Sequence, residues 1–317
     1  NEKISDLEAW IENMDGIKVR DLKKSEIIDK SAISEMSLYE DNFNRCFRLT
    51  HNSYPYKVIY TYKTTYRDYI TIARWSPIIY SAIPTRNAKL KIILPKGFQY
   101  TKYVNNISEG CRIDSTQNNI TLQWRAAYDT PIKTELFSQP NNIKPFVIVA
   151  PLHFEYGIVG SSKDWVSFGN WVYGLIQGLD VLPEDEKNKI TALINGMTDK
   201  KEIIKTLYHY LQDHTRYINV SIGIGGFKPY PASYVAQNKY GDCKALTNYM
   251  KAMLSFAGIE SFYTIVYASD QPLGFIKSFV GQQFNHVVLA VPLEKDTIWL
   301  ENTNNINPYS YMGTFTQ

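Results

Sequence analysis

Cysteine is scarce in this sequence, with only three among 317 residues: Cys46, Cys111 and Cys243. Such a small, odd number excludes the dense disulfide framework of small secreted domains. Cys46 and Cys111 can each be in one of two states, disulfide-bonded or reduced. They either pair in an oxidising compartment or stay reduced and behave as small buried hydrophobic residues. In both cases Cys243 is a free thiol.

Long apolar runs and basic tracts are also absent. No run approaches the roughly 18–20 apolar residues that a membrane-spanning helix needs. The 34 Lys and Arg residues nearly balance the 31 Asp and Glu residues, so the net charge is only +3. There is no dense basic tract or RNA-binding signature. We therefore expect no nucleic-acid partner and no membrane-spanning segment in this chain.

The first ten residues, NEKISDLEAW, lack a Met, a basic start and the apolar core of a signal peptide. We therefore expect a processed or trimmed piece of a longer protein, which continues beyond residue 317.

Hydrophobic residues make up 44% of the sequence and charged residues 21%, which is typical of globular proteins. The length exceeds one ordinary core. The sequence pattern changes from strand-like to helical along the chain, which predicts a β-rich domain over 1–155 and a second domain over 156–317.

The first domain is predicted to consist of strands. The segment YKVIYTYKTTY (56–66) alternates between two faces. Three further strand candidates are bounded by turn residues: AKLKIILP (88–95), ITLQW (120–124) and PFVIVAP (145–151). Many short strands with frequent turns predict a β-sandwich. The lone histidines of this half, His51 and His153, are predicted to be surface or packing residues.

Helical periodicity begins near residue 160 and is carried by 161–179, 183–197 and 199–217. His209 and His214 lie five residues apart, a poor spacing for two ligands on one helical face, so we predict no metal site there. The glycine-rich loop that follows lacks the Lys-Ser/Thr pair of a phosphate-binding loop. We expect neither a metal nor another cofactor.

Cys243 lies where a turn becomes a helix, in NKYGDCKALTNYMKAML (238–254). Apolar residues recur after it at spacings of three and four, which predicts an amphipathic helix that ends at Gly258. Unpaired N–H groups and the positive end of the helix dipole stabilise a thiolate in the first turn. The thiolate is the nucleophilic form of cysteine. The same N–H groups can stabilise an oxyanion on an attacked carbonyl.

A nucleophilic cysteine needs a base, which usually comes from elsewhere in the chain. His286 lies in the apolar segment QQFNHVVLAVPL (282–293), which is predicted to be a strand. A histidine in such a strand is by default a packed core residue. A cysteine at a helix start before it and an acid after it favour a general base instead.

The third group would orient the imidazole of His286. If a tight turn at 294–295 joins the two strands, His286 lies opposite Thr303, and Glu301 is its diagonal neighbour on the same face. A register shift of one residue turns Glu301 to the other face and leaves Asn302 as the orienting group. The sequence leaves this register open.

The order Gly-Asp-Cys, Asn-His and an acid in the next strand resembles the bacterial transglutaminase-like superfamily, which has a papain-like α+β fold and a Cys–His–Asp triad. The segment HTRYINVSIGIGGFKPYPASYVAQNKYGDCKALTNYMKAML (214–254) is similar to the core of a two-part family common in Bacteroidetes. In that family a β-rich domain of unknown function precedes the core. The segments WRAAYDTPIKTELFSQP (124–140) and GSSKDWVSFGNWVYGLIQGLDVLP (160–183) resemble its bridging region.

The resemblance implies an α+β protein with an N-terminal β-sandwich-like domain and a papain-like transglutaminase-type core. In that core the helix bearing Cys243 packs on an antiparallel sheet. Cys243 matches the nucleophile and His286 the general base. Glu301 stands where the superfamily commonly has Asp. An extra methylene moves a carboxylate by about a bond length or more, whereas catalytic geometry tolerates about 0.5 Å.

Five neighbouring residues have weaker predicted roles. Asp242 is predicted to cap the helix, and Lys244 to lie on the solvent side of its first turn. Gln237 precedes Cys243 by six residues, the spacing of an oxyanion donor in papain-like peptidases, although a loop glutamine is more often solvated. Tyr217 and Tyr240 either line the cleft or, by default, pack in the structure.

Two functions are compatible with these residues. The first is a cysteine acyl-transfer enzyme, most simply a peptidase or amidase acting on a peptide or protein through Cys243, His286 and Glu301. The second is a weakly active or inactive binding or assembly module at the cell envelope, which engages protein or glycan. The resemblance implies a periplasmic or secreted location.

Overall fold

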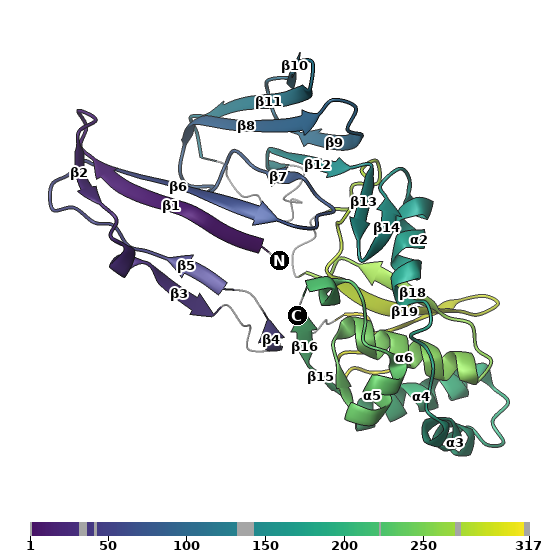
Figure 1. The fold of residues 1–317 in the computed structure, drawn as a ribbon. Coiled ribbons are helices and arrows are strands. Elements are labelled where there is room, and N and C mark those ends of the chain that lie inside the picture. The colour runs from purple at the N-terminus through teal and green to yellow at the C-terminus, as the bar shows by residue number, and fades with distance from the viewer. Residues whose placement is uncertain are drawn as a thin grey trace.

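The computed structural model describes residues 2–31, 37–40, 43–131, 143–221, 223–269 and 274–313. It is an α+β structure in which a strand-rich N-terminal half precedes a half that contains the helices (Figure 1). Part of the segment 124–140, which resembles a bridging region, lies outside the described residues.

Two sheets of the N-terminal half pack face to face. One has the order β10-β11-β8 and the other β7-β12-β9. Their bounds are Ala73–Trp75 (β7), Thr85–Pro95 (β8), Tyr100–Asn105 (β9), Arg112–Ser115 (β10), Asn119–Tyr128 (β11) and Phe146–Pro151 (β12). Alternate residues point inward. Ile92 and Leu94 of β8 pack with Trp124 and Val147 in a shared core, whereas Ile93 between them is exposed. The predicted sandwich is confirmed.

A further sheet projects from this sandwich (Figure 1). It has the order β2-β1-β6, with β1 at Glu2–Glu12, β2 at Lys18–Asp21 and β6 at Lys57–Tyr66. Beside it, β3 (Ile28–Ser31) pairs with β5 (Phe43–Cys46), and the 3-10 helix η1 spans Lys24–Glu26. The strand β4 (Ser37–Glu40) pairs with β16 (Asn219–Ser221), so the N-terminal half contacts the core through backbone hydrogen bonds.

The hairpin of β13 (His153–Tyr156) and β14 (Ile158–Ser161) leads into α2 (Trp165–Ile176). Asp164 caps this helix by accepting a hydrogen bond from the Ser167 N–H at 2.7 Å. Phe154 of the hairpin packs with Trp171 of α2 and with Ile70 of the N-terminal half. A Cβ at Gly160 would collide with Phe154 and Trp171, so the hairpin approaches α2 closely only with glycine there.

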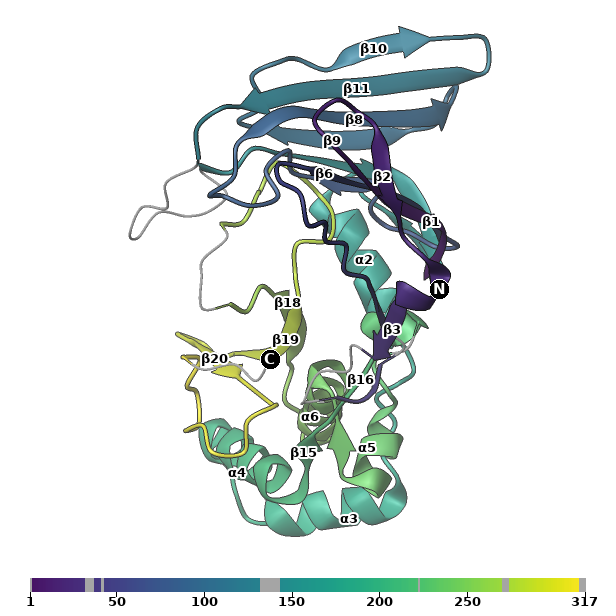
Figure 2. The same ribbon diagram turned by 90° about the vertical axis from the view of Figure 1, so that its left-hand side faces the viewer.

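The C-terminal half packs helices on the antiparallel sheet β18-β19-β20. Its elements are α3 (Glu184–Leu193), α4 (Lys200–His214), α5 (Ala232–Asn238), α6 (Cys243–Phe256), β18 (Phe262–Val266), β19 (His286–Pro292) and β20 (Thr297–Leu300). Two-residue strands β15 (Arg216–Tyr217) and β17 (Tyr240–Gly241) pair in parallel, and the 3-10 helix η2 spans Gly223–Gly226. The helices lie below the N-terminal sandwich (Figure 2).

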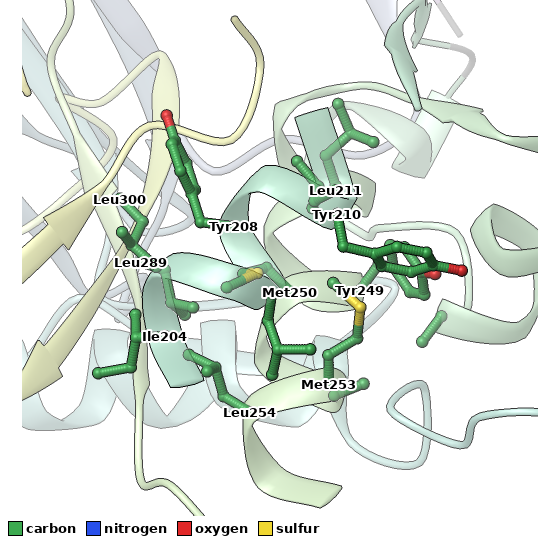
Figure 3. Close-up of a cluster of buried hydrophobic side chains, with 14 of the residues drawn as sticks. Ile204, Tyr208, Tyr210, Leu211, Tyr249, Met250, Met253, Leu254, Leu289 and Leu300 are labelled. Carbon is green, nitrogen blue, oxygen red and sulfur yellow. The ribbon is translucent and has the colours of Figure 1, made fainter. Parts of the chain in front are cut away.

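Leu289 and Leu300 of the sheet meet side chains of α4 and α6 in one core (Figure 3). Burial of α6 is wider than the predicted apolar stripe, because every residue from Cys243 to Met250 is buried. The first two turns of this helix therefore have no solvent side.

All three cysteines are unpaired. Cys46 and Cys111 are half-buried; Cys46 ends β5, whereas Cys111 precedes β10 and packs against the sandwich core, so the disulfide alternative is wrong. Within the described parts of the chain, no helix is long and apolar enough to cross a membrane.

Candidate active site

Cys243 is the first residue of α6 and is only 7% exposed. Asp242 is the N-cap residue, and its Oδ1 accepts a hydrogen bond from the Ala245 N–H at 2.9 Å, as predicted. Gly241 lets the chain turn tightly, because a Cβ there would lie 2.8 Å from the Ala245 Cβ. The N–H groups of Cys243 and Lys244 fall in the first turn, where a helix offers them no carbonyl partner.

His286 begins β19 and is buried. Its Nε2 lies 2.7 Å from Oε2 of Glu301, and the Cys243 side chain, which lines the same cavity, is near enough to the imidazole to raise its pKa. The structure therefore brings all three predicted site residues together. Cys243 comes from a helix start, His286 from a strand start and Glu301 from the residue after β20.

The strands β19 and β20 pair in the register that a tight turn at 294–295 produces. The Leu293 N–H donates to the Asp296 carbonyl at 2.7 Å, and Leu289 pairs with Leu300. Continued along the strands, this register sets His286 opposite Thr303 and makes Glu301 its diagonal neighbour.

Glu301 and Asn302 point to different partners. Oε1 of Glu301 accepts hydrogen bonds from Thr303, from its N–H at 2.9 Å and from its hydroxyl at 2.5 Å. These bonds hold the carboxylate against His286. The Nδ2 of Asn302 instead donates to the hydroxyl of Thr247 on α6 at 3.0 Å. Glu301, rather than Asn302, is therefore the group that faces the imidazole.

The environment of His286 favours the charged imidazolium. Burial opposes the charge and lowers the pKa. The hydrogen bonds and charges of Cys243 and Glu301 outweigh burial and raise the pKa of His286 to about 9. The site therefore stabilises the imidazolium that would form if the ring took a proton from Cys243.

This raised pKa predicts a pH dependence of stability. A folded-state pKa of about 9, against an ordinary 6.5, means that the native protein binds the proton more tightly than the unfolded chain does. The stabilisation is complete below about pH 6.5 and disappears as the pH rises to about 9. The difference in unfolding free energy between the wild type and His286→Gln should therefore shrink over this range in urea titrations. A constant difference would contradict the pKa shift.

The predicted location of Lys244 is wrong. Its side chain is buried, and its Nζ lies 2.6 Å from Oδ2 of Asp242. Burial favours the neutral amine, but the charges of Asp242 and Cys243 outweigh it and raise the pKa of Lys244. The ion pair compensates the negative charge of Asp242 beside Cys243, a charge that by itself would oppose thiolate formation.

The other predicted residues lie outside the site. Gln237 is exposed on α5 and does not line the cavity beside Cys243. Tyr217 packs against the core. The hydroxyls of Tyr240 and Tyr234 hydrogen-bond to each other. Packing is therefore the observed role of both predicted cleft tyrosines.

The remaining histidines also lie apart from the site. The His51 ring contacts Tyr56, and His153 is exposed on β13. His209 and His214 hydrogen-bond within α4. No cluster of His, Cys, Asp and Glu that could hold a metal occurs among the residues that the structure describes.

A cavity of about 80 Å³ opens beside Cys243 and His286. Part of its lining comes from residues that the sequence did not suggest. Val172 of α2, Phe227 after η2 and Tyr263 of β18 contribute to it. Their types are those of ordinary core residues, and they are far from Cys243 in the sequence, so no local signal marks them.

Comparison with known proteins agrees with this architecture. Residues 1–128 match a family described as a domain of unknown function, DUF3857. Residues 188–302 match the transglutaminase-like superfamily. A search among curated proteins found no match.

Among solved structures, the fold is similar to that of a putative protease from Parabacteroides distasonis, with a TM-score of 0.66 at 13% identity. The match covers 94% of this chain but only 59% of that one. A putative cysteine protease from Cytophaga hutchinsonii gives a TM-score of 0.31 at 10% identity, over 69% of this chain and 72% of that one. The periplasmic domain of TgpA from Pseudomonas aeruginosa gives 0.30 at 11% identity, over 74% and 76%. The two family matches identify a DUF3857 N-terminal domain over residues 1–128, followed by a transglutaminase-like core over residues 188–302.

Proposed function

We propose that this protein is a cysteine acyl-transfer enzyme that hydrolyses amide bonds in a peptide or protein. The observation that carries the proposal is that Cys243 lies in one cavity lining with an imidazole whose Nε2 is 2.7 Å from the buried carboxylate of Glu301. A buried thiol, base and acid in this order form the arrangement that activates a nucleophile.

In the first half of the proposed reaction, His286 takes the proton of Cys243. Because Nε2 faces Glu301, Nδ1 is the ring nitrogen left for the sulfur. The thiolate attacks the amide carbonyl carbon, a C–S bond forms, and the carbonyl oxygen becomes an oxyanion. The N–H groups of Cys243 and Lys244 at the helix start stabilise this charge. His286 then protonates the amine as the C–N bond breaks, which leaves a thioester on Cys243.

In the second half, His286 removes a proton from water, and the resulting hydroxide attacks the thioester. The C–S bond breaks, the carboxylic acid leaves, and Cys243 regains its proton. An amine in place of water would give transamidation. We favour hydrolysis, since the similar solved structure with the same overall fold is described as a putative protease. We also propose a periplasmic or secreted location, as the resemblance implies.

Iodoacetamide labelling tests the nucleophile. Cys243 is 7% exposed, whereas Cys46 and Cys111 are half-buried, so accessibility alone predicts that Cys243 reacts last. If Cys243 is an activated nucleophile, it should instead react first. We expect Cys243 to be alkylated at least about tenfold faster than the other two near pH 7, as measured by peptide mass mapping. Equal rates, or a slower Cys243, would contradict the proposal.

A library of acetylated octapeptides, with products read by mass spectrometry, tests turnover. We expect cleavage by the wild type and none by Cys243→Ala, with Cys111→Ala as the matched control that keeps activity. A reactive Cys243 without any Cys243-dependent cleavage would instead support the binding or assembly module at the cell envelope.

A further inference from the structure

The cavity beside Cys243 and His286 has an apolar wall that is supported from behind. Val172 of α2, Phe227, Ile265 of β18 and Phe284 line it. All four are half-buried and pack against the aromatic cluster that contains Phe168 and Trp171. The wall is thus held in place by a core.

The cavity offers no unpaired charge to a ligand. The charged groups in its lining are those of the site itself, and the Lys244 ammonium is already paired with Asp242 at 2.6 Å. A charged side chain entering this space would lose its hydration without gaining a partner, which is strongly unfavourable. The lining therefore favours an apolar occupant.

Volume limits the size of that occupant. An apolar cavity of about 150 Å³ accommodates benzene. The space beside Cys243 measures about 80 Å³, roughly half as much. It suits a branched side chain of three or four carbons better than an indole.

Two larger spaces share lining residues with the cavity. Val172, Tyr263 and Ile265 also line a neighbouring space of about 400 Å³ that extends along α2 and β18. Ile265 and Phe284 also line another of about 820 Å³, which reaches Arg74 of the N-terminal half. These adjoining spaces fit an extended chain that passes Cys243, as in a peptide, better than a small isolated amide.

We propose that the cavity is a specificity subsite that takes a branched aliphatic side chain, of valine or leucine size, from the acyl side of the scissile bond. This inference rests on the proposed function and adds the substrate class to it. Adding one methylene in such a pocket typically changes kcat/KM by about 10- to 200-fold.

N-acetyl dipeptidyl chloromethyl ketones test the subsite without requiring turnover, because they alkylate a nucleophilic cysteine. Two series, Ac-X-Gly and Ac-Gly-X, carry Ala, Val, Leu, Trp, Asp or Lys at X. Rates at Cys243 are measured by intact mass and divided by the iodoacetamide rate of the same protein. In one of the two series, we expect the normalised rate with Val or Leu at X to be at least about tenfold higher than the rate with Ala. It should also be higher than the rates with Trp, Asp and Lys.

A cavity-filling variant and a matched control complete the test. Val172→Phe, and independently Ile265→Phe, should bring the Leu-to-Ala rate ratio close to one. Val166 lies on the same helix but is 73% exposed, so Val166→Phe should keep the wild-type Leu-to-Ala rate ratio. Equal normalised rates for all X, with Cys243 still labelled selectively by iodoacetamide, would overturn the subsite alone. Unselective iodoacetamide labelling would overturn the proposed function itself.

A second inference comes from a different observation in the same cavity. The Tyr263 hydroxyl oxygen is buried and has no hydrogen-bond partner. Burial, together with the charges of Cys243 and Asp242, keeps the pKa of Tyr263 well above its usual value, so the hydroxyl stays a donor. An unpaired buried hydroxyl costs about 1–3 kcal/mol and is rare in native proteins. Its place in the cavity lining beside Cys243 suggests a ligand as the missing partner.

We infer that Tyr263 donates a hydrogen bond to the oxygen of the carbonyl that Cys243 attacks. The phenol would then act with the N–H groups of Cys243 and Lys244, and it would be a further catalytic residue of the proposed reaction. Loss of one such donor typically costs about 10²–10³-fold.

The test compares Tyr263→Phe with Tyr309→Phe. Tyr309 also carries a buried hydroxyl without a partner, but it packs on Tyr208 and does not line the cavity. Both variants should keep or raise Tm, since each removes an unsatisfied group. Only Tyr263→Phe should weaken the binding of acetyl-glycyl-leucinal, by about 10²–10³-fold, because the aldehyde forms a tetrahedral adduct with an oxyanion.

Iodoacetamide labelling distinguishes two roles of Tyr263, a hydrogen-bond donor to the oxyanion or a structural residue, since the reaction of iodoacetamide with sulfur creates no oxyanion. Unchanged aldehyde affinity in Tyr263→Phe would overturn the inference. A fall in Tm with a parallel loss in both reagents would show a structural role and overturn it as well. If the wild type binds no aldehyde at all, the proposed function fails first.

Discussion

Replacing Glu301 by glutamine should lower kcat/KM by about 10²–10⁴-fold and leave the protein folded. The carboxylate lies 2.7 Å from Nε2 of His286 and is held by Thr303, so an amide of the same shape keeps most contacts. The amide removes the negative charge that stabilises the imidazolium. The corresponding Asp→Asn replacement in the serine-protease triad lowers kcat by about 10⁴-fold, because it also leaves the histidine in the wrong tautomer. The rates are measured on the peptide that the wild type cleaves fastest.

Two further variants sharpen this test. Glu301→Asp has the residue type that the transglutaminase-like superfamily commonly uses, yet here it should also lose activity. The shorter side chain withdraws the carboxylate by about a bond length, whereas a tolerance of about 0.5 Å is typical. Glu294→Gln lies in the exposed turn of the same hairpin and should change nothing. Full activity in Glu301→Gln would remove Glu301 from the proposed triad.

Replacing Lys244 by methionine should destabilise the protein by about 3–5 kcal/mol, because it leaves a buried carboxylate without its partner. Asp242 is 3% exposed and Lys244 is 7% exposed. Removing both charges in Asp242→Asn/Lys244→Met should restore most of the stability, since asparagine also caps helices. Urea unfolding measures these changes.

The matched control is on the same helix. Lys251 lies 3.5 Å from Asp180, and both side chains are partly exposed, so Lys251→Met should cost at most about 1 kcal/mol. Lys244→Met should also slow the alkylation of Cys243 by iodoacetamide, because the Asp242 charge then faces a forming thiolate alone. Equal stability losses in both lysine variants would show that the Lys244 pair has no special role.

The positions of Cys243, His286 and Glu301 were predictable because each depends on local rules. A capping Asp before an apolar periodicity marks the helix start. Strand alternation and a tight turn at 294–295 restrict the register to two choices. Only the folded structure distinguishes them, since the sequence does not show whether Glu301 or Asn302 faces the imidazole.

Lys244 shows where local rules fail. A lysine near a helix start is usually solvated, but α6 lies so deep in the fold that its first turns have no exposed side. The depth of a helix depends on what packs around it, here α4, α5 and the sheet. The cavity was missed for the same reason, because its lining comes from segments far apart in the sequence.

The position of Val172 determines how the proposed specificity would change during evolution. The helix that supplies Val172 to the cavity spans Trp165–Ile176, between the stretches that match the two families, 1–128 and 188–302. Selectivity would thus be encoded partly in a connecting segment, apart from the residues that perform the chemistry. Under the proposed function, mutations in that connector would retune which peptides are accepted while Cys243, His286 and Glu301 stay untouched, and a minimal fragment cut to the recognised core would lose its discrimination before its reactivity.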